Sequence, residues 1–222
     1  MGHSTRMNAT LMPIFYSFRR CPYAIRARLS IAASGEQVEL REIVLRDKAP
    51  EFLETSPSAT VPCLKTGETV IDESLDIMLW ALDRSDPENW LKPEKGDLDA
   101  MLELIGVCDG PFKSHLDRYK YDTRYPDTDR ETEQAGAAEF LWHLDSRLAA
   151  TPWLFGGKAS LADFAILPFV RQFANSDRSW FDSQEWTSLK AWLEAFEVSP
   201  RFQSVMPKWN RWQPGDTPVV FP

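Results

Sequence analysis

The first 85 residues alternate between strand-like and helix-like patterns. Apolar runs and period-two alternation, both typical of strands, are separated by apolar residues at helical spacing. The predicted strands cover residues 11–18, 38–45, 61–65 and 69–72. The predicted helices run from Pro22 to about Ser34, over 50–55, and onward from Ser74, a residue type that favours the start of a helix. This β-α-β-α-β-β-α order predicts a small mixed sheet with helices on its faces.

Beyond residue 85 the pattern contains helices only. Residues 86–97 are rich in proline and charge and are predicted to form a linker. Further helices are predicted over residues 98–121, 132–150 and 189–196. Between them, Ser160 and Asp163 form a capping-box variant at the start of an apolar helix, in which Pro168 predicts a kink or an early end. The proline-rich tail from Trp209 is expected to be irregular.

Charge and cysteine content narrow the possible functions. The formal net charge of −8 argues against a nucleic-acid partner, because phosphate binding requires a dense cationic surface. Residues 1–85 carry a net charge of −1 and the remainder −7, so the first part is the better place for a small anionic ligand. No apolar run is long enough for a membrane helix, and the N-terminus lacks the apolar core of a secretory signal. The three widely spaced cysteines fit neither a disulfide framework nor a zinc site, so a cytoplasmic location is expected.

Cys21 has the most distinctive surroundings of the three cysteines. It follows Arg19 and Arg20, precedes Pro22, and stands between a predicted strand and a predicted helix. A helix N-terminus and nearby arginines stabilise a thiolate, so the pattern predicts a nucleophile whose pKa lies below that of a free cysteine. A buried core thiol is the alternative, and a metal site has no support because no nearby Cys or His completes a ligand set. Ala24 replaces the second cysteine of a Cys-x-x-Cys motif, so a second small thiol is needed to resolve a mixed disulfide at Cys21.

Several sequence features together resemble the cytosolic glutathione transferases, over residues 11 to about 209. They are the order of the elements, the all-helical second half, and the sequences Cys21-Pro22-Tyr23-Ala24, Thr60-Val61-Pro62 and Asp72-Glu73-Ser74. The Cys-Pro-Tyr-Ala motif is similar to cysteine-type, omega-like members and to monothiol glutaredoxins. The resemblance implies an α/β thioredoxin-like glutathione-binding domain at 11–85, the linker at 86–97, and an all-α domain at 98–222 that lines a second-substrate pocket.

The resemblance also assigns roles to individual residues in the first domain. Cys21 corresponds to the cysteine that forms a mixed disulfide with glutathione. Val61 and Pro62 correspond to a loop with a cis proline, in which the backbone of the preceding residue pairs with the cysteinyl part of glutathione. Glu73 and Ser74 correspond to the turn that holds the γ-glutamyl end. A helix N-terminus, a hydroxyl and a carboxylate suit the carboxylate and ammonium of that group.

Further residues are assigned on the same basis. Lys48 corresponds to a lysine that reaches the glycine carboxylate of glutathione. Tyr23, Arg118, Tyr119 and Tyr125 are candidates for the second-substrate pocket, because the helix that carries the last three faces the first domain in the implied fold. Glutathione is expected as a substrate, with no separate cofactor and no metal.

Other chemically active residues have simpler interpretations. Tyr16 ends the first strand, where other glutathione transferases keep a tyrosine that donates to the thiolate, although strand aromatics are mostly packing residues. Cys63 is interpreted as a buried strand thiol, with a resolving role as the alternative, and Cys108 as a core residue. His115 and His143 have no carboxylate or cysteine at ligand spacing and are interpreted as surface or packing residues.

The leading functional interpretation is an enzyme, a glutathione-dependent thiol transferase or reductase that acts through a mixed disulfide at Cys21. The alternatives are conjugation of glutathione to an electrophile, and a non-enzymatic interaction module of the same fold. The expected partners are glutathione and a small electrophile or disulfide acceptor, with no nucleic acid and no membrane. The resemblance also implies a homodimer, which the charge difference between the two domains permits but does not require.

Overall fold

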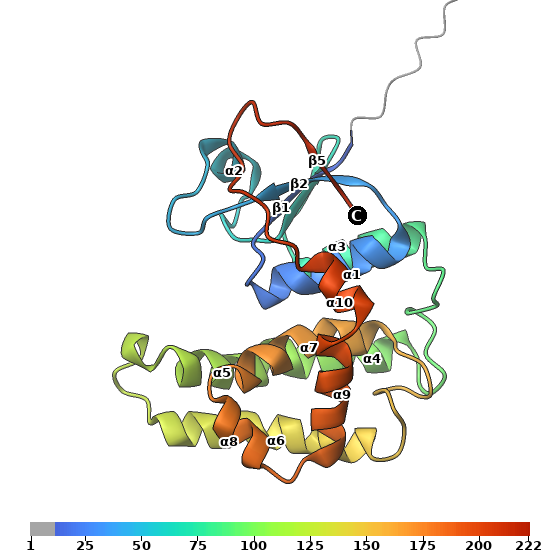
Figure 1. Ribbon diagram of the computed structural model, residues 1–222, viewed down its shortest axis with the longest axis vertical. Coiled ribbons are helices and arrows are strands. Elements are labelled where there is room, and N and C mark those ends of the chain that lie inside the picture. Colours follow the sequence, from blue (N-terminus) through green and yellow to red (C-terminus); the bar gives the residue numbers. More distant parts are fainter. Residues whose placement is uncertain (1–11) are drawn as a thin grey trace, which may run out of the picture.

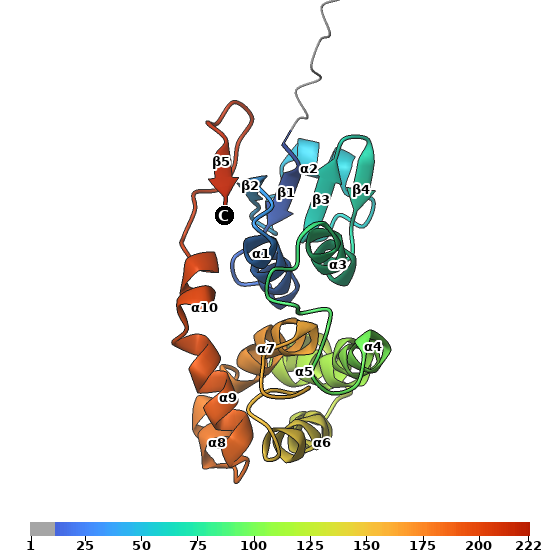
Figure 2. The ribbon, with the colours of Figure 1, turned by 90° about the vertical axis from the view of Figure 1, so that its right-hand side faces the viewer.

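The computed structural model describes residues 12–222. The segment considered above for a secretory signal lies outside these residues, as does the first residue of the first predicted strand. Figures 1 and 2 show two stacked parts, a sheet with its covering helices and a bundle of helices beneath it. The C-terminal segment leaves the bundle and runs back up beside the sheet.

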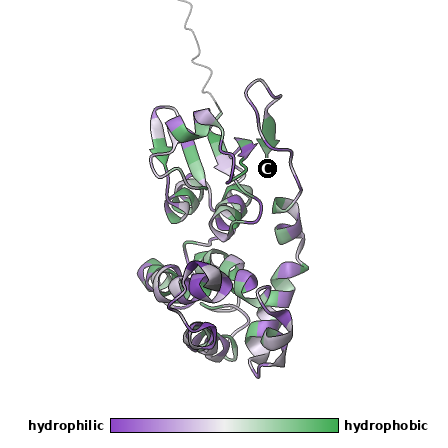
Figure 3. Cartoon of the chain, turned by 90° about the vertical axis from the view of Figure 1, so that its left-hand side faces the viewer, coloured by the Kyte–Doolittle hydropathy of each residue, from purple (hydrophilic) through white to green (hydrophobic). Residues whose placement is uncertain are grey.

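The sheet has five strands in the order β4-β3-β1-β2-β5. They are β1 (Ile14–Ser17), β2 (Val38–Glu42), β3 (Cys63–Thr66), β4 (Thr69–Ile71) and β5 (Val219–Phe221). Strands β1 and β2 are parallel and the other three pairings are antiparallel. The strands carry both hydrophobic and hydrophilic residues (Figure 3), and Phe15 pairs with Leu40 and Leu64 at the centre of the sheet, where all three are buried.

Strand β5 corrects the prediction that the proline-rich tail is irregular. Val219 pairs with Leu40, and Phe221 pairs with Val38. The Phe221 side chain is buried and meets the ring of Trp209 edge-on, with the ring centroids 5.9 Å apart. Without this strand, the edge of β2 would expose unpaired backbone groups. A run of only three residues among prolines is too short for its pattern to separate it from a loop.

Three helices cover the sheet. They are α1 (Pro22–Ser34), α2 (Pro50–Thr55) and α3 (Ser74–Arg84). Helices α1 and α3 pack side by side between the sheet and the helical bundle, whereas α2 lies at the other side of the sheet (Figures 1 and 2). Pro22 occupies the first turn of α1, where a missing N–H costs nothing, and Gly35 ends the helix with a φ of 75°.

The helical part contains α4 (Leu98–Val107), α5 (Lys113–Lys120), α6 (Arg130–Leu148), α7 (Leu161–Ala174), α8 (Arg178–Ser183), α9 (Thr187–Glu197) and α10 (Pro200–Val205). The helix predicted over 98–121 is interrupted by a π-helical turn at Cys108–Phe112. Pro111 lies in this turn and has no N–H for the i−4 carbonyl, which accounts for the wider turn.

Helix α7 does not end early at Pro168. All residues from Leu161 to Val170 are buried, so packing on every side holds the helix across the missing hydrogen bond. The capping box at its start is confirmed, because Asp163 accepts from the backbone N–H of Ser160 and from its hydroxyl.

The segment predicted as a linker packs firmly onto the bundle. Trp90 is buried, and its ring stacks on Phe164 of α7 with the centroids 4.0 Å apart. Its backbone carbonyl accepts a hydrogen bond from the N–H of Leu161. Within residues 12–222, no helix is both long and apolar enough to cross a membrane.

Candidate active site at the N-terminus of helix α1

Cys21 is the N-cap residue of α1 and is partly exposed. Its backbone N–H bonds to the carbonyl of Phe18, and its carbonyl accepts from Ile25, so the strand–helix turn holds it rigidly. The Sγ atom lies 3.7 Å from the carbonyl oxygen of Val61. This places the thiol between the start of α1 and the loop that precedes β3.

The pKa of the Cys21 thiol corrects the prediction made from the sequence. Burial raises this pKa above its ordinary value, and this effect outweighs the backbone N–H groups of Ala24 and Tyr23, which lower it. Lys113 and Arg26 also lower it, but the expected cations point elsewhere. Arg19 donates to the carbonyl of Met206, and the Arg20 guanidinium lies 5.2 Å from the centre of the Phe18 ring.

The raised pKa predicts how the reactivity of Cys21 depends on pH. Below its pKa the thiolate fraction rises tenfold for each pH unit, so alkylation of the free protein by iodoacetamide should accelerate about tenfold per unit between pH 7 and pH 9. Peptide mass spectrometry that follows the Cys21-containing peptide measures this rate. A rate that levels off below pH 8 contradicts a raised pKa.

A cavity of about 410 Å³ opens beside Cys21. It is lined by Tyr23, Arg26, Thr60, Val61, Pro62, Asp72, Glu73, Ser74 and Asp109. These residues come from α1, the loop before β3, the start of α3 and the π-helical turn of the bundle. The predicted cis peptide bond between Val61 and Pro62 is confirmed. The cavity therefore brings together four of the residues assigned to glutathione, Val61, Pro62, Glu73 and Ser74.

A buried arginine in the cavity lining binds two other lining residues. Arg26 of α1 is 2% exposed and donates from Nε to the Ser74 hydroxyl at 3.1 Å. Its two terminal nitrogens make a bidentate pair with the Asp109 carboxylate, both at 2.8 Å. Because Ser74 accepts from Arg26, its own hydroxyl hydrogen is left to donate to a ligand carboxylate. The triad also connects the first domain to the π-helical turn of the bundle.

Sequence reasoning missed Arg26 and Asp109. The available signals were a charged residue inside the apolar run Ala24-Ile25-Arg26-Ala27 and an acid directly before Gly110. Neither signal indicates a partner, because the two residues are 83 positions apart in the sequence.

Asp72 fixes the loop that leads to Val61. It accepts from the Ser56 hydroxyl at 2.7 Å and from the Ser58 N–H at 2.8 Å. Partial burial acts to raise the pKa of Asp72, but these hydrogen bonds outweigh burial and lower it. The ionised carboxylate therefore holds the loop that forms one wall of the cavity, and Asp72 itself belongs to the cavity lining.

The remaining residues assigned to the site lie away from this cavity. Lys48 is partly buried in the loop before α2 and is absent from the cavity lining. Arg118 pairs with Glu133, and Tyr125 lies 6.0 Å from its guanidinium. Tyr119 is buried in the bundle, where its hydroxyl accepts from Gln134. Of the four second-substrate candidates, the structure brings only Tyr23 to the cavity.

Tyr23 connects the cavity to the helical part. Its ring meets Phe169 of α7 edge-on at 4.7 Å, and Arg26 lies 5.2 Å from its centre. By contrast, the hydroxyl of Tyr16 accepts a hydrogen bond from Arg41 at 3.0 Å. Cys63 of β3, which pairs with Tyr16 of β1, is buried.

The Cys63 thiol is deactivated by its surroundings. Burial, together with the neighbouring carboxylate of Asp72, raises the pKa of Cys63 to about 12. Burial also raises the pKa of Cys108, which is fully enclosed in the core. Among the three cysteines, Cys21 is therefore the one that combines access with helix N–H groups.

Comparison with known proteins shows which protein family the chain resembles. The model of the glutathione S-transferase N-terminal domain matches residues 15–90, and that of the C-terminal domain matches residues 127–195. Glutathione S-transferase omega-1 of Rattus norvegicus is 29% identical over 192 residues, which is 83% of this chain and 76% of the relative. A zeta-class glutathione S-transferase of Euphorbia esula is 26% identical over 206 residues, 86% of this chain and 88% of the relative.

Solved structures give the same fold. A glutathione transferase family member from Pseudomonas fluorescens, solved with two glutathione molecules bound, superimposes with a TM-score of 0.77 at 17% identity. The match covers 90% of this chain and 95% of the other. The chain belongs to the glutathione transferase superfamily, with a thioredoxin-like first domain and a helical second domain.

Proposed function

We propose that the protein is a glutathione-dependent thiol transferase with Cys21 as its nucleophile. Membership of the superfamily supports glutathione-dependent activity in general. The single observation that carries the finer assignment is the position of the Cys21 Sγ, 3.7 Å from the Val61 carbonyl and beside the cavity that holds Ser74 and Glu73. A glutathionyl group bound in that cavity places its sulfur next to the Cys21 thiol.

The reaction has two balanced steps of thiol–disulfide exchange. The Cys21 thiolate attacks the glutathionyl sulfur of a mixed disulfide, the Cys21–glutathione bond forms, and the acceptor leaves as a thiolate with the electron pair of the broken bond. A glutathione thiolate then attacks the glutathionyl sulfur on Cys21, which releases oxidised glutathione and restores the Cys21 thiolate. In the net reaction the added glutathione is oxidised to the disulfide and the acceptor sulfur is reduced to a thiol, while the glutathionyl sulfur of the substrate stays at the disulfide level.

Conjugation of glutathione to an electrophile is the second candidate. One observation favours it: burial raises the pKa of Cys21, and a neutral S–H is a donor to a bound glutathione thiolate. Tyr16 does not supply that donor, because its side chain is buried beside Arg41 of β2 and does not line the cavity next to Cys21.

The test of the proposal is the intact mass of the protein after incubation with oxidised glutathione. We expect one adduct of glutathione mass, mapped to Cys21 by peptide analysis, and its removal by reduced glutathione. Turnover of a model mixed disulfide and conjugation of chlorodinitrobenzene are measured on the same sample. Conjugation without any adduct or disulfide turnover identifies the second candidate, and no binding of glutathione by calorimetry leaves the non-enzymatic module.

A further inference from the structure

A second cavity, of about 290 Å³, opens beside residues that neighbour Cys21 in the sequence. It is lined by Arg19, Arg20, Ile25, Lys120, Pro168, Arg171, Gln172, Asn175 and Met206. Arg19 and Arg20 directly precede Cys21, and Ile25 lies one helical turn after it on the same face of α1. The two cavities share no lining residue, so two separate spaces adjoin the segment around Cys21.

This cavity is strongly cationic in a chain whose net charge is −8. Four of its nine lining residues are arginine or lysine, and no carboxylate lines it. Arg19 and Arg20 come from the β1–α1 loop, Lys120 from the end of α5 and Arg171 from α7. Cations from both domains therefore line the same cavity.

Few carboxylates neutralise these four cations. The Arg20 guanidinium lies over Phe18, and the Lys120 ammonium lies 5.1 Å from the centre of the Tyr121 ring. The guanidinium of Arg19 donates to a backbone carbonyl. None of these three has an ion pair with a carboxylate in the described part of the chain.

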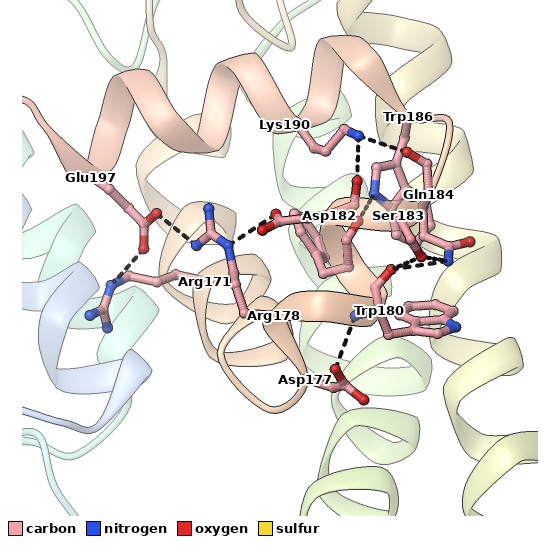
Figure 4. A network of polar contacts seen from close by, with 11 residues as sticks. Arg171, Asp177, Arg178, Trp180, Asp182, Ser183, Gln184, Trp186, Lys190 and Glu197 are labelled. Atoms are coloured by element: carbon pink, nitrogen blue, oxygen red, sulfur yellow. Dashed lines mark hydrogen bonds and ion pairs between the residues drawn. The ribbon is translucent and has the colours of Figure 1, made fainter.

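Arg171 has a carboxylate partner, but it shares that partner with another arginine. Glu197 of α9 lies 3.3 Å from Nε of Arg171 and 3.1 Å from a terminal nitrogen of Arg178. Figure 4 shows this arrangement, with the terminal nitrogens of Arg171 turned away from Glu197. Burial lowers the pKa of Arg171 although the Glu197 carboxylate acts to raise it, and the positive charges of Arg19 and Arg178 add to the lowering. Positive charge thus remains in excess at this position.

The cavity also contains an unused polar group. Gln172 Oε1 is buried and has no hydrogen-bond partner among the described residues. Oxygen and nitrogen of a glutamine amide exchange places by a half-turn, so the same position also serves as a donor. With the amide of Asn175 beside it, the wall offers neutral hydrogen bonds as well as charge.

We propose that this cavity binds the leaving half of the disulfide substrate, and that it selects a small thiol that carries one or more carboxylates. The inference rests on the proposed thiol transfer and adds the chemical class of the second substrate. Arginine and lysine bind carboxylates by charge-assisted hydrogen bonds. In the first exchange step the leaving sulfur also gains a negative charge, and the same cations stabilise it in the transition state. A volume of about 290 Å³ admits a small molecule.

The test compares three glutathione mixed disulfides of similar size, made with 3-mercaptopropionate, 2-mercaptoethanol and cysteamine. Their leaving halves are anionic, neutral and cationic. We expect kcat/KM, divided by the rate of uncatalysed exchange of each disulfide with glutathione, to fall in that order, by about tenfold between the anionic and the cationic substrate at low salt. Higher ionic strength should reduce the ratio, because exposed charges are screened.

A double variant tests whether the preference for the anionic substrate arises from this cavity. Arg20 and Lys120 are both exposed, so R20Q/K120Q should fold normally and lower the anionic-to-cationic ratio about threefold to tenfold. The matched control K92Q/K95Q removes the same two charges from exposed positions in the linker and should leave the ratio unchanged.

The possible outcomes distinguish failure of the inference from failure of the proposed thiol transfer. Equal kcat/KM relative to uncatalysed exchange for the three substrates, or an unchanged ratio in R20Q/K120Q, overturns the inference while thiol transfer stands. Absence of turnover with all three substrates, together with no Cys21 adduct, overturns thiol transfer and the inference with it.

Discussion

Replacing Cys21 with serine should reduce thiol transfer by at least about a thousandfold, because a hydroxyl cannot form the mixed disulfide on which the proposed reaction depends. The fold should persist. The thiol makes one weak hydrogen bond, to the Val61 carbonyl, and serine also suits an N-cap position. Glutathione should still bind, since Glu73, Ser74 and the Val61-Pro62 loop are untouched. Turnover of a mixed disulfide, with calorimetry of glutathione binding, measures both effects.

Cys63→Ala is the matched control for this variant. Cys63 is fully buried and its pKa is raised to about 12, so its removal should leave turnover unchanged. The two candidate functions also predict different results for the Cys21→Ser variant. Cys21→Ser should retain or increase conjugation, because serine donates to a glutathione thiolate as a neutral thiol does. Full disulfide turnover in Cys21→Ser would falsify the nucleophile assignment and return Cys21 to the class of packing residues.

Replacing Asp163 with alanine should cost about 3 kcal/mol or more of unfolding free energy, since buried donors without partners are expensive. The Asp163 carboxylate is fully buried and accepts from the backbone N–H groups of Leu154 and Ser160, the Ser160 hydroxyl and the Trp192 indole. These contacts begin α7, tie it to the preceding loop and connect it to α9. Urea denaturation of the wild type and the variant gives the difference.

Asp129→Ala provides the comparison for Asp163→Ala. Asp129 caps α6 at the surface, where it accepts from the N–H of Thr132 at 2.9 Å. Water replaces this acceptor when it is lost, so a much smaller cost than that of Asp163→Ala is expected. If Asp163→Ala is no more destabilising than Asp129→Ala, the buried cap does not carry the role described for it.

Local sequence signals predicted the framework because they act over a few residues. Pro22 and Gly35 bound α1 by their own backbone preferences, and Ser160 with Asp163 marks the start of α7 three residues apart. The cis bond before Pro62 was expected from the resemblance and is present. These features need no knowledge of distant partners.

Features that depend on distant partners were missed or predicted wrongly. The pKa of Cys21 depends on how deeply neighbouring elements bury the thiol, which the arginines beside it in sequence do not reveal. The pair between Arg26 and Asp109 requires the bundle to dock on α1. The second cavity likewise unites Arg19 with Arg171, two cations that lie in different domains.

The pairing of β2 with β5 bears on how the chain is made in the cell. Residues 38–42 are synthesised long before their partners at 219–221. During synthesis, the nascent sheet therefore has an open backbone edge along β2, and such an edge can pair with other chains. A stop codon shortly before residue 219 removes β5 and leaves that edge open permanently, so the truncated product is expected to aggregate.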